Sequence, residues 1–173
     1  MKKHIFITNG VGGCGKDTFS NFVNEFIPTF KHSSIDKVKK IARECGWEGG
    51  KTEKDRKFLS DLKLLTTNYN DMPFEDLKKI VKIFLYNTPY PVLIIDIREP
   101  EEIERAKNEF GAKTILIRNN RIKPITSNMA DANVENYNYD FIIENNGTLE
   151  EFRETVRRFV EDNIKTKEKI NHE

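Results

Sequence analysis

The sequence is poor in cysteine and in long apolar runs, and each shortage excludes a class of protein. Its two cysteines, Cys14 and Cys45, show neither a metal-ligand spacing nor a disulfide framework, which suits a reducing compartment. No apolar run approaches the roughly 20 residues of a membrane span, and the first apolar run is too short for a signal peptide. We therefore expect a cytoplasmic protein with no membrane partner.

The chain also lacks an excess of charge of either sign. Lys and Arg number 29 against 28 Asp and Glu, so the net charge is +1 among 173 residues. A balance of this kind gives no long-range field to attract nucleic acid, and no nucleic-acid partner is expected. The length suits a single domain, residues 1–173, with one sheet and helices on both of its faces.

Glycines are concentrated near the start, where they form the pattern of a phosphate-binding loop. Residues 10–16 fit G-x-x-x-x-G-K, in which backbone N–H groups surround phosphates and the lysine contacts the outer phosphoryl oxygens. A strand-like run at residues 4–8 precedes the loop, and apolar residues at helical spacing follow it. The predicted nucleotide-binding residues here are Gly10, Gly12, Gly13, Cys14, Gly15, Lys16, Asp17 and Thr18.

The loop departs from the usual pattern at the residue after the lysine. Asp17 stands where Ser or Thr is usual, and the hydroxyl follows one residue later as Thr18. The carboxylate of Asp17 either reaches Mg2+ through water or turns outward and caps the helix, and both alternatives stay open. For Cys14 a thiolate could be favoured beside a helix N-terminus, but the preferred interpretation is a small residue tolerated in a loop.

Strand-like and helix-like segments alternate along the rest of the chain, which predicts an α/β fold with a parallel sheet. Further strands are expected at about 30–35, 91–96, 114–117 and 141–143. Helices are expected from residue 36 to 45, over two segments before residue 88, and around 103–110 and 149–160. The expected apolar face of the first of those two segments consists of Phe58, Leu59, Leu62 and Leu65.

The apolar run at residues 91–96 is typical of a central parallel strand, and it ends in Asp96. Ligands of open α/β sheets bind at the carboxyl ends of the strands, so Asp96 and Arg98 are expected near the phosphate-binding loop. The alternatives are that Asp96 caps the next turn and that Arg98 forms a surface ion pair with Glu101 or Glu102.

Four passages carry a likeness to a known family: residues 15–18, 36–47, 96–101 and 143–148. With them the chain resembles P-loop nucleoside and nucleotide kinases, and within these the bacteriophage-type deoxynucleoside monophosphate kinases. The pair Gly46-Trp47, followed by Lys54-Asp55-Arg56 and an apolar helix, is the more particular part of the likeness.

The resemblance implies an enzyme, a nucleotide kinase that uses ATP and Mg2+. It implies a P-loop kinase fold with a five-stranded parallel sheet of strand order 2-3-1-4-5, flanked by helices. The core would comprise residues 1–35 and 88–173, with a helical acceptor-binding insert at about 36–87 and a short lid at about 118–136.

Phosphoryl transfer depends mostly on positioning and charge neutralisation, which suggests roles for the charged residues. Lys16 would hold the transferring phosphate, and Arg98 would orient the acceptor or neutralise developing charge. The metal residues would be Thr18 and Asp96. The catalytic set is Lys16, Asp96, Arg98 and Arg118.

Further residues are assigned to a lid and to the binding of the adenine. The lid would use Arg118 and Arg121, whereas a plain basic loop explains Lys123 about as well. Asn145 and Gly147 occupy the place where related kinases hold the adenine. The spacing of Thr148 and Glu151 also predicts a capping box there.

The expected partner is a small-molecule phosphate acceptor, in first place a ribo- or deoxynucleoside monophosphate. A monophosphate is already an anionic nucleophile, and Arg56 and Arg98 suit a phosphate, so the acceptor-binding residues are Asp36, Arg56 and Arg98. A hydroxyl acceptor needs a base. Asp36 lies where such a base occurs in dephospho-coenzyme A kinases and other small-metabolite hydroxyl kinases, which form the alternative.

An alternative of another class is a nucleotide-gated binding protein that phosphorylates no acceptor. The sequence has no guanine-reading N-K-x-D motif, and a helical insert with arginines is more than a switch requires.

Overall fold

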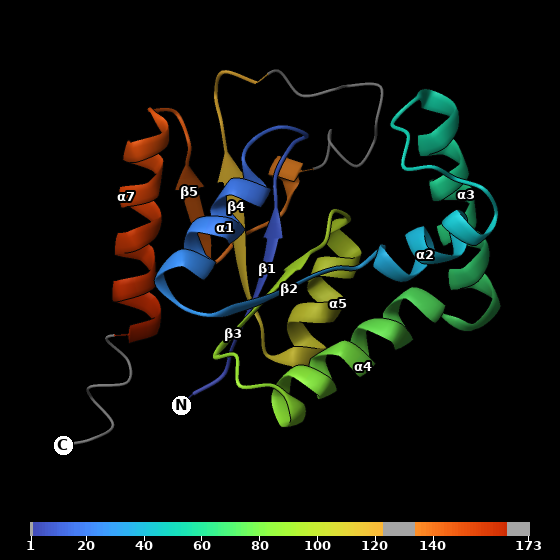
Figure 1. Ribbon diagram of the computed structural model, residues 1–173, viewed down its shortest axis with the longest axis horizontal. Helices are drawn as coiled ribbons and strands as arrows, with labels where there is room; N and C mark the ends of the chain where they lie inside the picture. Colours follow the sequence, from blue (N-terminus) through green and yellow to red (C-terminus); the bar gives the residue numbers. More distant parts are fainter. Residues whose placement is uncertain (1, 123–133, 166–173) are drawn as a thin grey trace. The chain divides into compact units, whose positions relative to one another are not determined.

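The strands and helices follow the predicted alternation. The computed structural model describes residues 2–122 and 134–165. The strands are β1 His4–Asn9, β2 Thr29–Ser33, β3 Val92–Asp96, β4 Lys113–Arg118 and β5 Phe141–Glu144 (Figure 1). The helices are α1 Lys16–Phe26, α2 Asp36–Glu44, α3 Glu53–Asn70, α4 Met72–Asn87, α5 Pro100–Phe110 and α7 Leu149–Val160, with short turns η1 Val134–Asn136 and η2 Glu161–Lys165. None of the helices in the described ranges has the length and apolar content needed to cross a bilayer.

The strands form one parallel sheet in the order β2-β3-β1-β4-β5, which confirms the predicted fold class and strand order. β1 pairs with β3, where Thr8 lies opposite Asp96, and with β4, where Asn9 lies opposite Leu116. β4 pairs in turn with β5. Because all these pairs are parallel, the carboxyl ends of β1, β3 and β4 meet at one edge of the sheet, where ligands of such folds bind.

The chain divides into two compact units. Residues 1–31 and 89–173 form one, called here the sheet unit, and residues 32–88 form the other, called here the helical unit. The predicted phosphate-binding loop, Asp96, Arg98 and Asn145 belong to the sheet unit. Asp36 and Arg56 belong to the helical unit.

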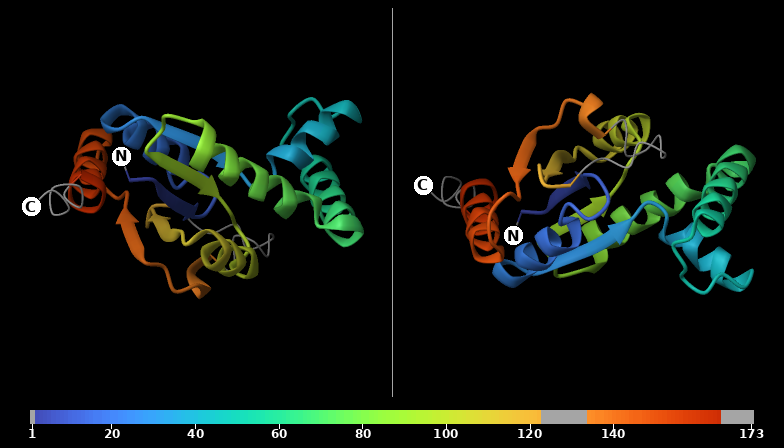
Figure 2. Two further views of the ribbon diagram at one scale, coloured as in Figure 1. Left: turned by 90° about the horizontal axis from the view of Figure 1, so that it is seen from below. Right: turned by 90° about the horizontal axis from the view of Figure 1, so that it is seen from above.

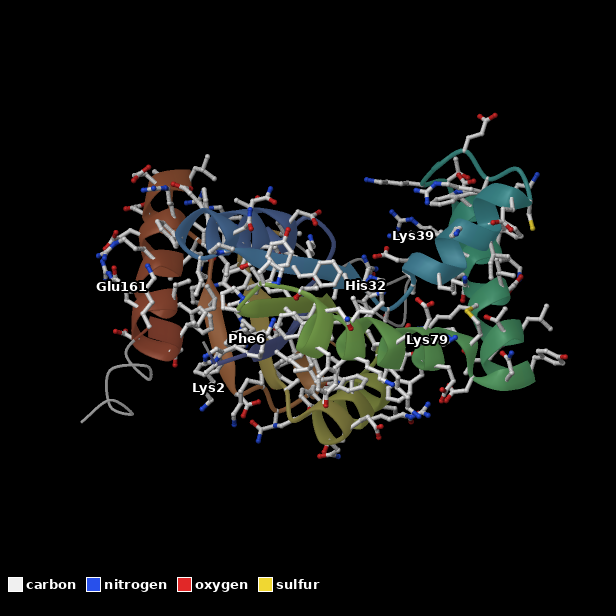
Figure 3. The ribbon with its side chains drawn as sticks, turned by 60° about the horizontal axis from the view of Figure 1, so that its bottom comes forward. Lys2, Phe6, His32, Lys39, Lys79 and Glu161 are labelled. Carbon is white, nitrogen blue, oxygen red and sulfur yellow. The ribbon has the colours of Figure 1, made fainter. Side chains whose placement is uncertain are left out.

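Helices cover both faces of the sheet within the sheet unit, α1 and α7 on one face and α5 on the other (Figure 2). Successive residues of β1 (Phe6 is labelled in Figure 3) alternate between these faces, with Phe6 packed among residues of α1 and α7 and Ile7 facing the opposite side. Both side chains are buried, and each such burial contributes about 2 kcal/mol of hydrophobic free energy.

Aromatic rings fix α7 to the rest of the sheet unit. The ring of Phe159 lies with its centroid 5.5 Å from that of Phe6 on β1 and 5.3 Å from that of Phe141 on β5. A third contact, 5.9 Å between centroids, joins it to Phe19 of α1. Edge-to-face contacts of this kind add to the free energy of burying the rings.

Within the helical unit, α2, α3 and α4 contact one another. The start of α3 is set by a capping box in which Thr52 and Asp55 bond each other's backbone N–H. The expected apolar face of α3 is only partly used: Leu59 and Leu62 are half-buried, whereas Phe58 and Leu65 are exposed. The helix packs through a face rotated away from Phe58 and Leu65. No residue of α3 is fully buried.

The second strand is shorter than its predicted range of 30–35. β2 ends at Ser33, because the chain turns there and the Oδ2 of Asp36 accepts a hydrogen bond of 2.9 Å from the Ser33 N–H. His32, at the end of β2 (Figure 3), is the first residue of the helical unit.

Asp140, which no sequence motif singles out, anchors the start of β5. Its carboxylate accepts hydrogen bonds of 2.9 Å from the N–H and the hydroxyl of Thr114 on β4, and it forms ion pairs with Lys107 and Lys113. Burial by itself raises the pKa of Asp140, but these donors outweigh it and hold the pKa well below the ordinary range. The ionised carboxylate therefore joins β4, β5 and α5.

We predict that Asp140→Asn lowers the free energy of unfolding by about 2 kcal/mol at neutral pH, because the buried donors lose a charged acceptor. The folded-state pKa is depressed, so this stabilisation is fully present above the unfolded-state pKa of about 4 and declines progressively as the pH falls from there toward the folded-state pKa. Urea denaturation of both proteins between pH 7 and pH 3 measures the difference, which should shrink with falling pH.

The control is Asp61→Asn, which removes an exposed ion pair with Lys57 and should change stability by less than about 0.5 kcal/mol. A difference for Asp140→Asn that stayed constant across this pH range would contradict the assigned role.

Candidate nucleotide-binding site

The phosphate-binding loop connects β1 to α1 at the carboxyl edge of the sheet. Three of its glycines have positive φ: Gly10 at 151°, Gly13 at 84° and Gly15 at 107°. Gly15 is the N-cap of α1, and α1 begins at Lys16. The backbone N–H groups of the first turn of a helix lack intrahelical partners and favour anions, so the loop and helix end form a site suited to phosphates.

Two of these glycines also lie against neighbouring strands. A Cβ on Gly10 would lie 2.5 Å from the carbonyl oxygen of Ile117 on β4, and one on Gly15 would lie 2.5 Å from the Nδ2 of Asn145 after β5. The loop is therefore packed against the ends of β4 and β5, and a side chain at either position would displace it.

Cys14 belongs to the core and not to the surface of the loop. Its side chain has no exposed area and packs with the apolar residues between α1, α7 and the sheet. Burial raises the pKa of the Cys14 thiol above its ordinary value, and the nearby Lys16 only partly offsets this. Burial therefore disfavours the thiolate alternative and agrees with the preferred interpretation, a small residue tolerated in the loop.

The side chain of Lys16 folds back over the phosphate-binding loop. Its ammonium donates a hydrogen bond to the carbonyl of Gly10 and a weaker one, of 3.3 Å, to that of Val11. Thr18 lies in the first turn of α1 and is half-buried. Both residues are thus positioned by the loop and the helix start together.

Asn9, which the sequence did not single out, joins the loop to β3 and to the segment before β5. Its Oδ1 accepts from the Gly10 N–H at 2.8 Å, and its Nδ2 donates to the carbonyl of Arg98 at 3.0 Å. The same Nδ2 donates to the hydroxyl of Tyr139 at 2.8 Å. Burial raises the pKa of Tyr139 to about 12, so the phenol stays neutral. The backbone of Arg98 is in this way held beside the start of the loop, while its side chain is exposed.

Asp96, at the end of β3, lies beside Thr8, Lys31 and Asp17. Its Oδ1 accepts a hydrogen bond of 2.5 Å from the hydroxyl of Thr8, and its Oδ2 is 3.5 Å from the Nζ of Lys31 on β2. The Nζ of Lys31 also donates to the Oδ1 of Asp17. The carboxylate of Asp17 therefore points toward β2.

Arg118 and Arg121 are the expected lid residues. The guanidinium of Arg118 pairs with Glu135 at 2.5 Å and with Glu144 at 3.3 Å. Arg121 is exposed, and its N–H donates to the side chain of Asn119 at 3.0 Å. Of the predicted lid, residues 123–133, which include Lys123, lie outside the described residues.

The segment after β5 contacts the loop directly. Asn145 donates from its Nδ2 to the carbonyl of Cys14 at 2.9 Å, and its N–H donates to the carbonyl of Arg118 at 2.7 Å. The capping box of Thr148 and Glu151 at the start of α7 is confirmed. Asn145 and Gly147 therefore lie on a fixed turn next to the phosphate-binding loop.

Asp36 and Arg56, the predicted acceptor residues of the helical unit, contact different neighbours. Asp36 accepts from the Ser33 N–H, and its Oδ2 lies 3.5 Å from the Nδ1 of His32, whose Nε2 lies 4.0 Å from the Oδ2 of Asp76. Burial lowers the pKa of His32 in spite of both carboxylates, so the ring is neutral at neutral pH. Arg56 is exposed in the first turn of α3, and its Nε donates to the carbonyl of Lys51 at 3.2 Å.

The residues expected to bind Mg2+ fit that ion in their chemistry. Thr18 and Asp96 offer a hydroxyl and a carboxylate, the oxygen ligands that Mg2+ prefers. Within residues 2–122 and 134–165, no three His, Cys, Asp or Glu side chains gather to hold a metal by themselves.

The strand order and the glycine-rich loop between β1 and α1 define the P-loop kinase fold. Among solved structures, the chain is similar to thymidylate kinase from Ehrlichia chaffeensis, with 11% identity over 92% of this chain and 100% of that chain and a TM-score of 0.53. For dephospho-CoA kinase from Campylobacter jejuni the identity is 16%, the coverage 92% and 97%, and the TM-score 0.52. For shikimate kinase from Aquifex aeolicus the identity is 12%, the coverage 92% of this chain and 97% of that chain, and the TM-score 0.51.

No protein-family model matches the sequence, and no curated protein matches it. The resemblance to P-loop kinases is thus confirmed at the level of the fold. The likeness to bacteriophage-type enzymes stays a prediction.

We predict that Gly10→Ala lowers the free energy of unfolding by about 2–4 kcal/mol. The new methyl group would meet the carbonyl of Ile117 and the sulfur of Cys14, each at 2.5 Å, at a φ of 151°. Chemical denaturation measures the loss.

The matched control is Gly111→Ala at the end of α5. Its φ is also positive, at 61°, but apart from its immediate chain neighbours no atom of the described residues lies within 4 Å of the added Cβ. We expect a loss of about 1 kcal/mol there, from backbone strain alone. Equal losses at the two positions would argue against close packing of the loop on β4.

Proposed function

We propose that the protein is an ATP-dependent phosphotransferase that moves the γ-phosphoryl group to a ribo- or deoxynucleoside monophosphate. The observation that carries this proposal is the arrangement at one edge of the sheet, where the phosphate-binding loop, Asp96 and the backbone of Arg98 are joined by hydrogen bonds through Thr8 and Asn9. The fold shared with solved kinases supports it.

The donor half would rest on the loop and on Lys16. The N–H groups of the loop and of the first turn of α1 would bind the β- and γ-phosphates, and Lys16 would leave the carbonyl of Gly10 to contact the γ-phosphate. When bound, Mg2+ would neutralise phosphate charge, with Thr18 and Asp96 as its protein partners. Asn145 and Gly147 would lie near the adenine.

The acceptor half would use arginines, because a planar guanidinium binds a phosphate with two hydrogen bonds. Arg98 follows β3 and has its backbone fixed beside the loop by Asn9, which suits a residue that orients the acceptor phosphate. Arg56 is exposed at the start of α3 in the helical unit. Arg118 would contribute to catalysis once its guanidinium exchanges Glu135 and Glu144 for a phosphate group. Arg121 would belong to the lid.

A second candidate is a kinase for a hydroxyl acceptor, such as dephospho-coenzyme A. It is favoured by the surroundings of Asp36, whose carboxylate lies 3.5 Å from a half-buried His32 that is neutral at neutral pH. A carboxylate beside a neutral imidazole is suited to accept the proton of a hydroxyl group. Solved kinases with this fold include those for dephospho-CoA and shikimate.

The test is a coupled assay of ADP release with deoxynucleoside monophosphates, ribonucleoside monophosphates, dephospho-coenzyme A and shikimate as acceptors. We expect turnover with one or more monophosphates. In Arg98→Ala, kcat/KM for that acceptor should fall about 100-fold while the Kd for ATP changes less than about twofold, since the lost contact belongs to the acceptor. Arg158→Ala, which changes an exposed arginine of α7, is the control and should leave kcat/KM unchanged.

Other outcomes point to the other candidates. Turnover restricted to dephospho-coenzyme A or shikimate, and abolished in Asp36→Asn, would replace the proposed acceptor by a hydroxyl. ATP binding with no acceptor-dependent turnover would indicate a nucleotide-gated binding protein.

A further inference from the structure

Lys31 places a positive charge among the residues of the donor site, although no motif includes it. It lies on β2, and its ammonium contacts the carboxylate of Asp17 and lies 3.5 Å from the Oδ2 of Asp96. All three residues belong to the sheet unit. Their side chains differ in exposure: Asp96 is 20% exposed, Lys31 33% and Asp17 89%.

Two carboxylates at this place oppose the binding of a triphosphate. Asp17 lies in the first turn of α1, directly after the lysine of the phosphate-binding loop, and Asp96 ends the strand next to β1. Two unit charges 4 Å apart interact by about 1–4 kcal/mol at a protein surface. An uncompensated carboxylate near the phosphates would therefore weaken nucleotide binding, whereas an ammonium between the two carboxylates cancels much of that repulsion.

A lysine ammonium is protonated at neutral pH, and that of Lys31 is held by the carboxylate of Asp17 and lies near that of Asp96. Lys31 is thus a permanent cation, in contrast to Mg2+, whose presence at the site depends on its concentration.

We propose that Lys31 is a positioning residue that serves as a built-in cation of the donor site, holding the Asp17 carboxylate toward β2 and neutralising Asp17 and Asp96 so that a triphosphate binds without relying entirely on Mg2+. The inference rests on the proposed function, since it assumes that the loop binds ATP. The pairing with Lys31 adds a third possibility to the two alternatives for Asp17, because its carboxylate contacts the ammonium of β2.

If Lys31 has this role, it limits how strongly the affinity for ATP depends on Mg2+. With Lys31 present, the carboxylates are partly neutral before Mg2+ arrives, so ATP affinity should depend moderately on the metal. Without Lys31, the screening of the two carboxylates from the phosphates falls mainly to the metal. The ratio of the ATP Kd in EDTA to the ATP Kd in excess Mg2+ therefore measures the role of Lys31.

The experiment is a calorimetric titration of the full chain with ATP, in EDTA and in excess Mg2+. We expect the Kd ratio to be about tenfold larger in Lys31→Met than in the unmodified protein, mainly through weaker binding in EDTA. Lys31→Arg, which keeps the charge, should bring the ratio back to within about threefold. Asp17→Asn removes one of the two carboxylates at an exposed position, so its ratio should fall below that of the unmodified protein.

The matched control is Lys57→Met, which also removes a lysine from an ion pair but in the helical unit, and its ratio should equal that of the unmodified protein. An unchanged ratio in Lys31→Met overturns the inference, and so does an unchanged or larger ratio in Asp17→Asn, a variant that does not depend on the folding of Lys31→Met. An unmodified protein that binds ATP in neither buffer overturns the proposed function itself, which makes the two failures distinguishable.

Discussion

The candidate site depends on the close packing of the phosphate-binding loop against the ends of β4 and β5. Gly10 lies against the carbonyl of Ile117, Gly15 against Asn145, and the side chain of Cys14 is buried between the loop and the core. Protein interiors are packed densely enough that a loop held in this way has little freedom to rearrange. The orientation of the first turn of α1, and with it that of Lys16 and Thr18, follows from these contacts.

The second property of the site is its balance of charge. Lys16 and Lys31 contribute two cations, and Asp17 and Asp96 contribute two carboxylates, all within the sheet unit. The proposed phosphoryl transfer would be governed by positioning and by neutralising phosphate charge, so it would need no strong field from the rest of the protein. The net charge of +1 over the whole chain agrees with this view.

The fold could be predicted because its signals are local. The run ending in Asp96 and the glycines after β1 identify buried strands and a turn from adjacent residues alone. Asn9 and Lys31 could not be found in this way, since their partners are up to 130 positions away and a strand residue's neighbours depend on register and strand order. The apolar spacing correctly predicts the helix α3. Which of its faces is covered depends on packing, and Phe58, predicted on the apolar face, is exposed.

The most direct test of the central claim, that the loop between β1 and α1 is the donor-nucleotide site, is the binding of ATP with Mg2+ to the unmodified protein and to Lys16→Met. We predict one ATP bound per chain and a Kd that rises about tenfold or more in Lys16→Met, with the thermal unfolding temperature nearly unchanged, because a charged contact to the phosphates is lost. Equal affinity of the two proteins for ATP, or no binding by the unmodified protein, would contradict the account.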